Sequence, residues 1–190
     1  MDEQSTTGAP AAGLLRRIAA LAYDCLPLFA ILFVGTVAVL PLTGGEAITP
    51  ATEGLAAYLA YRAFLALLAL GYFGLAWTRG GQTIGMMAWK IRLVDRGAHA
   101  PGWPTALWRF AFGFVLAVAA ESGLRLAYEP GAAASGIAAG LLLLPLAANF
   151  AWIPFDPQRR SLQDLACGTR MLRTRVSAHA PDRDGGNHGQ

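Results

Sequence analysis

One carboxylate stands inside an apolar segment that is long enough to cross a membrane. Asp24 lies within an otherwise uncharged run over residues 18–42, with Arg16 and Arg17 just before it. An ionised carboxylate in a bilayer costs about 2.5–3.5 kcal/mol even on the most lenient scale, so such a residue usually has a function or a specific partner. Asp24 is therefore either a group that handles a cation or a proton, or a structural carboxyl that fixes the register of its helix.

Charged side chains also interrupt two later apolar segments. Arg62 and Glu121 fall at comparable depths in these segments, so we predict an ion pair between two helices. Arg125 follows Glu121 by one helical turn, in the favourable order, and is the alternative partner. We interpret this outer pair as structural, because each charge lowers the cost of burying the other.

Other kinds of chemistry have no matching residue pattern. His99, His179 and His188 lack metal-ligand spacing, and no Ser/His/Asp arrangement or catalytic carboxylate pair can be named, so we expect no metal site, no cofactor and no enzymatic activity. Cys25 and Cys167 form no CxxC motif, and we expect two reduced thiols. The net charge of +3 is explained better by membrane topology than by nucleic-acid binding.

The composition indicates a membrane domain. Of the 190 residues, 55% are hydrophobic and 14% are charged. At about 1.5 Å per residue, four apolar runs can each cross about 30 Å of hydrocarbon. We predict transmembrane helices over about residues 16–42, 55–78, 105–127 and 132–153, and hence an all-α four-helix transmembrane bundle. The first run is too long for the core of a cleaved signal peptide.

The positions of lysine and arginine predict the orientation. All of them except Arg62 and Arg125 lie at the N-terminal flank of the first helix, between the second helix and the start of the third, or after the fourth. The two opposite connections contain Glu46, Glu53 and Glu129 instead. By the positive-inside rule, both termini and the long middle loop are cytoplasmic.

Short elements are expected on that cytoplasmic side. Residues 89–95 and 169–176 alternate apolar and basic side chains, which predicts a small interfacial β element that anionic lipid headgroups would attract. Residues 82–88 predict a short interfacial helix or turn, and Ser161 with Asp164 fits a capping box at the start of another. Residues 1–13 and 177–190 are expected to be disordered, which leaves one membrane domain over residues 14–176.

Three motifs resemble the RDD family of bacterial membrane proteins. They are Arg-Ile-Ala-Ala-Leu-Ala-Tyr-Asp at residues 17–24, Gly-Gln-Thr-Ile-Gly at 81–85 followed by Ile-Arg-Leu-Val-Asp at 91–95, and Phe-Asp-Pro-Gln-Arg-Arg-Ser-Leu-Gln-Asp-Leu-Ala-Cys-Gly-Thr at 155–169. The family is named after one arginine and two aspartates. The resemblance assigns these to Arg17, Asp24 and Asp164, with Asp156 as the alternative second aspartate. It covers about residues 15–173.

The resemblance implies a multi-pass protein of the bacterial inner membrane, and membrane transport, including cation and proton exchange, as the activity usually proposed. This chain departs from the family pattern at two positions. Met86 stands where many relatives have lysine, and Gln163 stands where many have histidine. Because Gln163 does not titrate near neutral pH, we do not expect a proton relay through that motif.

The family positions combine with neighbouring polar residues into one predicted inner cluster. Asp24 and Asn149 lie at similar depth within the bundle, with Arg17, Arg109 and Asp164 at its cytoplasmic rim. Arg17 and Asp24 share a helix face but are about 10 Å apart along it, so they touch only if Arg17 reaches inward.

Two functions follow from these predictions. The chain is a cation- or proton-linked transporter that uses Asp24, or a membrane scaffold or assembly factor without transport, whose charged clusters are structural. Four helices enclose little room for a permeation path, so transport would require a homo-oligomer. Small residues at Gly71, Gly74, Gly136 and Gly140 would allow close helix packing. The expected partners are the bilayer, its anionic headgroups at the cytoplasmic face and further copies of the chain, but not nucleic acid.

Overall fold

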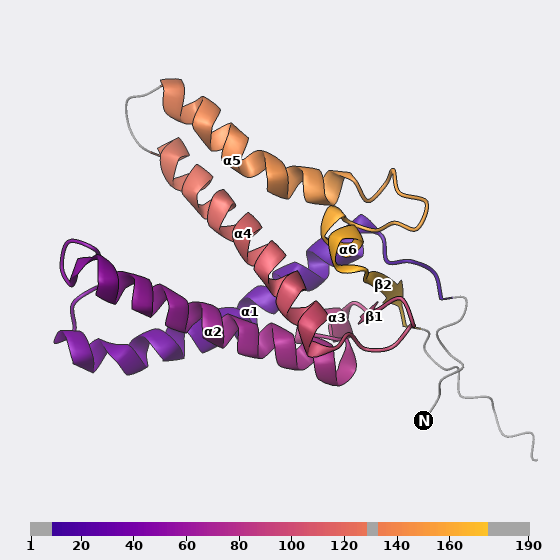
Figure 1. Cartoon of the computed structure of the whole chain (residues 1–190), viewed down its shortest axis with the longest axis horizontal. Helices are drawn as coiled ribbons and strands as arrows, with labels where there is room; N and C mark the ends of the chain where they lie inside the picture. Colours follow the sequence, from indigo (N-terminus) through magenta and orange to yellow (C-terminus); the bar gives the residue numbers. More distant parts are fainter. Residues whose placement is uncertain (1–8, 129–132, 175–190) are drawn as a thin grey trace, which may run out of the picture.

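Two helical hairpins converge on a small layer of strands and short helices (Figure 1). The computed structural model describes residues 9–128 and 133–174. The first hairpin joins α1 (Leu14–Val39), prolonged by the 3-10 helix η2 (Leu40–Thr43), to α2 (Gly54–Gly80), and the second joins α4 (Trp103–Tyr128) to α5 (Ala133–Ala151). The small layer consists of α3 (Ile84–Ala88), β1 (Ile91–Val94), α6 (Leu162–Cys167) and β2 (Arg170–Arg173).

Three described helices are long and apolar enough to cross a membrane. They cover Leu14–Thr43, Gly54–Gly80 and Trp103–Tyr128, close to the first three predicted spans. The fourth predicted span coincides with α5, whose apolar part, Gly136–Ala151, is shorter. The mostly helical fold with three candidate spans and a small sheet is therefore established, whereas the fourth span and the orientation of the termini stay predictions.

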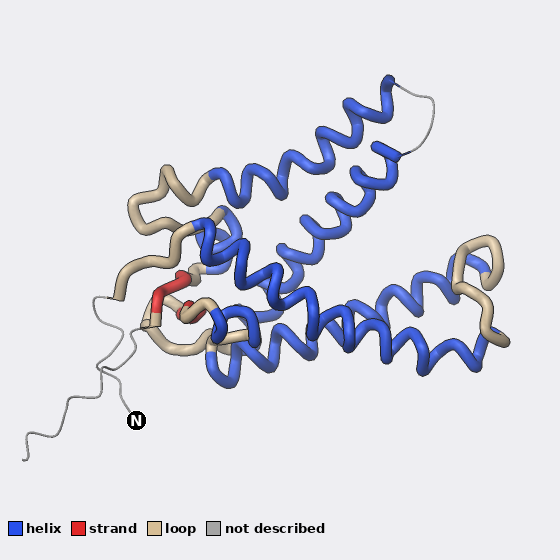
Figure 2. The backbone as a smooth tube through the Cα atoms, turned by 180° about the vertical axis from the view of Figure 1, so that it is seen from behind, coloured by secondary structure: helices blue, strands red, loops and turns tan. Residues whose placement is uncertain are grey.

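The two hairpins diverge away from the small layer (Figures 1 and 2). They meet where α2 packs against α4, while α5 packs on α4 and α6. A Cβ atom at Gly74 would lie 2.9 Å from the ring of Trp103, and one at Gly123 would lie 2.9 Å from a carbonyl oxygen of α5, so both helix contacts need glycine. Gly71, Gly136 and Gly140 have no such neighbour within 4 Å, and the close-packing role predicted for these three is absent from the described helix contacts.

The predicted β element is an antiparallel pair of strands. Ile91 is opposite Arg173, and Val94 is opposite Arg170. The strands are shorter than the predicted segments, since Lys90 has a left-handed backbone with φ of 53° just before β1 and Gly168 ends α6 in the same region, with φ of 64°, shortly before β2. Residues 175–176 of the second predicted segment lie outside the described residues.

The N-terminal segment is part of this layer. Ala11 forms a β-bridge with Leu172, and the fully buried Ala12 donates its backbone N–H to the carbonyl of Met171. The prediction of disorder up to residue 13 therefore does not hold for residues 10–13. Their composition conceals this pairing because the contacts are made by backbone groups. Residues 1–8 and the predicted tail at 177–190 lie outside the described residues.

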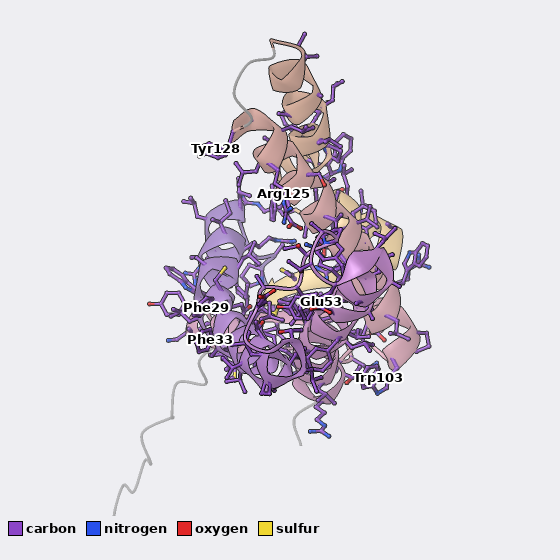
Figure 3. All side chains as sticks on the ribbon, turned by 90° about the vertical axis from the view of Figure 1, so that its left-hand side faces the viewer. Phe29, Phe33, Glu53, Trp103, Arg125 and Tyr128 are labelled. Carbon is purple, nitrogen blue, oxygen red and sulfur yellow. The ribbon has the colours of Figure 1, made fainter. Side chains whose placement is uncertain are left out.

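The buried core lies at the small layer rather than along the hairpins. It consists of Ala12, Ala20, Trp77, Met86, Ile91, Leu93 and Ala106. The hairpins instead carry exposed apolar side chains, such as Phe29 at 69% exposure and Ile137 at 72%. Figure 3 shows Phe29 and Phe33 on the outer side of the molecule. A surface of this kind is suited to contact with lipid tails.

Candidate functional site

Asp24 is bound by three neutral donors from two other elements. Its Oδ1 accepts hydrogen bonds from the hydroxyl of Tyr72 at 2.7 Å and from the backbone N–H of Gly85 at 2.8 Å. Its Oδ2 accepts one from the hydroxyl of Thr83 at 2.5 Å. Only 3% of Asp24 is exposed. The buried carboxylate thus joins α1 to α2 and to the start of α3.

The Gly-Gln-Thr-Ile-Gly motif has the geometry that this contact requires. Gly81 ends α2 with φ of 67°, and Thr83 caps α3 by accepting the backbone N–H of Met86. A Cβ atom at Gly85 would lie only 2.0 Å from the carbonyl oxygen of Ala20. Glycine at position 85 therefore lets α3 approach α1 closely enough for its backbone to reach Asp24.

The partners of Asp24 differ from those of a typical buried carboxylate, which is paired with a cation. The hydroxyls of Tyr72 and Thr83 donate to it, and a hydroxyl group is able both to donate and to accept a hydrogen bond. No arginine or lysine binds Asp24 within the described residues, so its charge is stabilised by hydrogen bonds alone. The same part of the chain contains no group of three or more His, Cys, Asp or Glu side chains that could hold a metal ion.

Asp164 is bound by two buried arginines from different helices. Its Oδ2 forms a short ion pair with Nη1 of Arg17 on α1, and its Oδ1 lies 2.7 Å from Nη1 of Arg109 on α4. The side chains of Arg17, Arg109 and Asp164 are 4%, 3% and 0% exposed. We name Arg17, Arg109 and Asp164 the inner ion cluster; it fixes α1, α4 and α6 at one point.

Each member of the inner ion cluster has further hydrogen bonds. Arg109 also donates to the hydroxyl of Thr169 at 2.7 Å, and its guanidinium lies 5.7 Å from the ring centre of Trp77. Asp164 completes the predicted capping box with Ser161 at the start of α6. Burial alone would raise the pKa of Asp164, but the charges of Arg109 and Arg17 outweigh it and hold the pKa below its ordinary value.

Asn149 lies near the inner ion cluster rather than in contact with Asp24. Its side-chain oxygen accepts the backbone N–H of Gln163 at 2.9 Å, and Gln163 in turn donates to the carbonyl of Arg109 at 2.8 Å. The single inner cluster expected from the sequence is therefore divided in two. Depth along a helix does not determine which way a side chain points. The carboxylate of Asp24 binds groups of α2 and of the start of α3, whereas the side chain of Asn149 binds α6.

The outer charges form a group of three. Arg62 makes two hydrogen bonds with Glu121, at 3.0 and 2.7 Å, and Arg125 binds the same carboxylate at 2.6 Å. Both partners considered for Glu121, Arg62 and Arg125, therefore bind its carboxylate. The side chains of Arg62 and Glu121 are 32% and 38% exposed, and Arg125 is 66% exposed. The side chains of this group are far more exposed to their surroundings than those of the inner ion cluster.

Asp156, the alternative second aspartate, has a local role. It binds Arg160 at 3.0 Å and accepts backbone N–H groups of Gln158 and Arg160. The ion pair with Arg160 lowers its pKa to about 2. Asp156 therefore organises the turn after α5, whereas Asp164 joins three elements that are distant in sequence.

Sequence reasoning missed four residues of these sites. They are Tyr72, Thr83 and Gly85 around Asp24, and Thr169 beside Arg109. Three of the four stand inside the quoted motifs, so the motifs themselves carried the signal. The sequence carried no such signal for Tyr72, because one tyrosine in an apolar helix is indistinguishable from a packing residue.

No curated protein and no solved structure matches the chain. Residues 11–168 match the sequence model of the RDD family, and this region contains both Asp24 and the whole inner ion cluster. Because the match covers most of the sequence, the chain belongs to the RDD family.

Proposed function

We propose that this RDD-family chain is a multi-pass protein of the bacterial inner membrane with both termini in the cytoplasm. The distribution of lysine and arginine supports this orientation. Trp103 and Trp108 lie in the first two turns of α4, and Trp152 directly follows α5. They are 46%, 62% and 45% exposed, as expected for a membrane interface. The 19 residues of α5 extend about 28 Å, so α5 is the fourth span of the proposal.

Within that membrane we propose that the protein is a scaffold or assembly factor whose charges are structural. One observation carries the proposal: Asp164, fully buried, binds Arg17 from α1 and Arg109 from α4 while capping α6. A doubly paired carboxylate of this kind resists the movement that alternating access would require of it, because separating the pair leaves buried charges unpaired. The protein so proposed has no catalytic activity.

The protein would bind two kinds of partner. The exposed basic side chains of the small layer, among them Lys90, Arg96 and Arg173, would bind anionic lipid headgroups. Further copies of the chain would cover part of the helical surface in a homo-oligomer. The mass of the protein in detergent, measured by light scattering, distinguishes a monomer from such an assembly.

Cation- or proton-linked transport is the second candidate, and the surroundings of Asp24 favour it. All three of its partners are neutral, and two are hydroxyls that can reverse their hydrogen bonds. A carboxyl in such a site can exchange a proton without leaving a buried cation unpaired. Transport would require water to reach Asp24 from both sides of the membrane.

Purified protein in liposomes that contain a pH dye separates the two candidates. Sodium, potassium and proton gradients are applied to the wild type, to Asp24→Asn and to Asp156→Asn as a carboxylate control away from the helices. Flux in the wild type and the control, lost in a folded Asp24→Asn variant, would establish transport and refute the scaffold. No flux in any of them, beside a working exchanger, together with altered assembly of Asp24→Asn, would support the scaffold.

A further inference from the structure

A small cavity lies beside the start of α1 and the segment that follows α5. Its volume is about 190 Å³, and it is lined by Leu14, Ile153, Pro154 and Arg159. Three of these residues are apolar and the fourth is a cation. Such a lining is complementary to a molecule with an apolar part and an anionic group.

The backbone of Arg159 is held in an unusual conformation at this cavity. Its φ of 52° lies in the left-handed region, which is uncommon for residues other than glycine. Its N–H donates to the carbonyl of Asp156 at 2.8 Å, and its carbonyl accepts from Nη2 of Arg17 at 2.6 Å. Strain that neighbouring groups maintain in this way is common at functional positions. Arg17, the family arginine, thus also positions Arg159.

The guanidinium of Arg159 has no carboxylate partner among the residues that the structure describes. Its side chain is exposed and lies beside the start of α1, where a Cβ atom at Gly13 would be 3.4 Å from its Nη1. No carboxylate among the described residues forms a salt bridge with it, and the nearby Asp156 is already bound by Arg160. Within the described part of the chain, the charge of Arg159 is therefore available to an external anion.

The position of the cavity identifies the class of anion, given the membrane placement proposed above. Trp152 and Phe155, at the same end of α5, are 45% and 79% exposed, which is typical of a membrane interface. We infer that the cavity binds the headgroup end of an anionic phospholipid of the cytoplasmic leaflet. Arg159 binds the phosphate, and Leu14 and Pro154 contact the glycerol and the first acyl carbons, whereas Ile153, which is 1% exposed, lies at the base of the cavity.

The inference is tested with the full chain in a neutral detergent. Phosphatidylglycerol or phosphatidylcholine is titrated in, and the rise in Tm is followed, because a lipid that binds the folded state stabilises it. Arg159→Gly removes the guanidinium and suits the left-handed backbone, so this variant should fold at least as well as the wild type. We expect about tenfold more phosphatidylglycerol to be needed for half of the maximal rise in Tm.

Arg79→Gln is the matched control. Arg79 is an exposed arginine at the last turn of α2, on the same proposed side of the membrane but outside the cavity. A normal response to phosphatidylglycerol in Arg79→Gln, with a weakened one in Arg159→Gly, would support the site. Equal responses to the two lipids, an unchanged response in Arg159→Gly, or an equal loss in both variants would overturn it. Because no flux is measured, failure here leaves the choice between scaffold and transporter untouched.

Discussion

The carboxylate of Asp164 binds the guanidinium of Arg17 across 147 residues of sequence. Arg109 binds the other oxygen of the same carboxylate, so one buried negative charge lies between two positive ones. Arg17 and Asp164, to which the resemblance assigns the family arginine and one family aspartate, are therefore direct partners, whereas Asp24 contacts a different set of groups. Because Asp164 joins α1, α4 and α6, substitutions at Asp164 should destabilise the whole fold.

Asp164→Asn should be strongly destabilising. The variant leaves Arg17 and Arg109 buried without a counter-charge, a change that typically costs about 3–5 kcal/mol. Thermal or denaturant unfolding in detergent measures the effect. Asp156→Asn, which removes a carboxylate from the more exposed pair with Arg160, is the control and should cost clearly less. Equal stability of the two variants would contradict the central role of the inner ion cluster.

Gly85→Ala should disturb the contact between α1 and α3. The added methyl group would lie 2.0 Å from the carbonyl oxygen of Ala20, so the helices must move apart. Overpacking of this kind costs about 1–3 kcal/mol, and the hydrogen bond to Asp24 would be weakened as well. Gly80→Ala is the matched control, since a Cβ atom there meets nothing within 4 Å. Comparable unfolding of both variants would show that this close approach is unimportant.

Tyr72→Phe tests the hydrogen bonding of Asp24. It removes only the hydroxyl that donates to Oδ1, and a hydrogen bond to a charged group is worth about 1.5–3 kcal/mol. Tyr23→Phe, at a half-exposed tyrosine of α1, should leave the free energy of unfolding nearly unchanged. If the two substitutions have the same effect, Asp24 does not depend on this donor.

Acid should weaken the fold through Asp156 and Asp164, whose pKa values are both lowered. A carboxyl with a lowered pKa contributes its stability above its ordinary pKa of 3.8 and loses it as the pH falls to the folded value, about 2 for Asp156. Unfolding should therefore become easier between about pH 4 and pH 2. Asp156→Asn should flatten the dependence of Tm on pH in that window, and an unchanged slope would contradict the assignment.

Glu121 should be coupled more strongly to Arg62 than to Arg125 in the free energy of unfolding. A double-mutant cycle for Arg62 and Glu121 should give up to about 1 kcal/mol, since the pair has two hydrogen bonds and is partly exposed. The cycle for Arg125 and Glu121 should give about 0.3–0.5 kcal/mol, the usual value for an exposed pair one turn apart. A larger coupling for Arg125 would reverse our assignment of the main partner.

Much of the fold could be predicted from local patterns. Apolar runs indicated α1, α2 and α4 within a few residues, because helix length and membrane thickness are linked by a fixed rise. Alternation indicated the strands, and Ser161 with Asp164 indicated the start of α6. The N-terminal pairing at Ala11 was missed, since backbone hydrogen bonds leave no mark on side-chain composition.

By itself, the sequence determined which groups must be paired: Asp24, Arg62, Arg109 and Glu121 stand in apolar segments where an isolated charge is costly. Only the tertiary structure decided the partners. Asp24 and Arg17 share one face of α1, yet α3 supplies Asp24 with the backbone N–H of Gly85 and α6 supplies Arg17 with a carboxylate. The physical reason is that a sequence position fixes depth along a helix, whereas hydrogen bonds of about 3 Å depend on how separate elements pack.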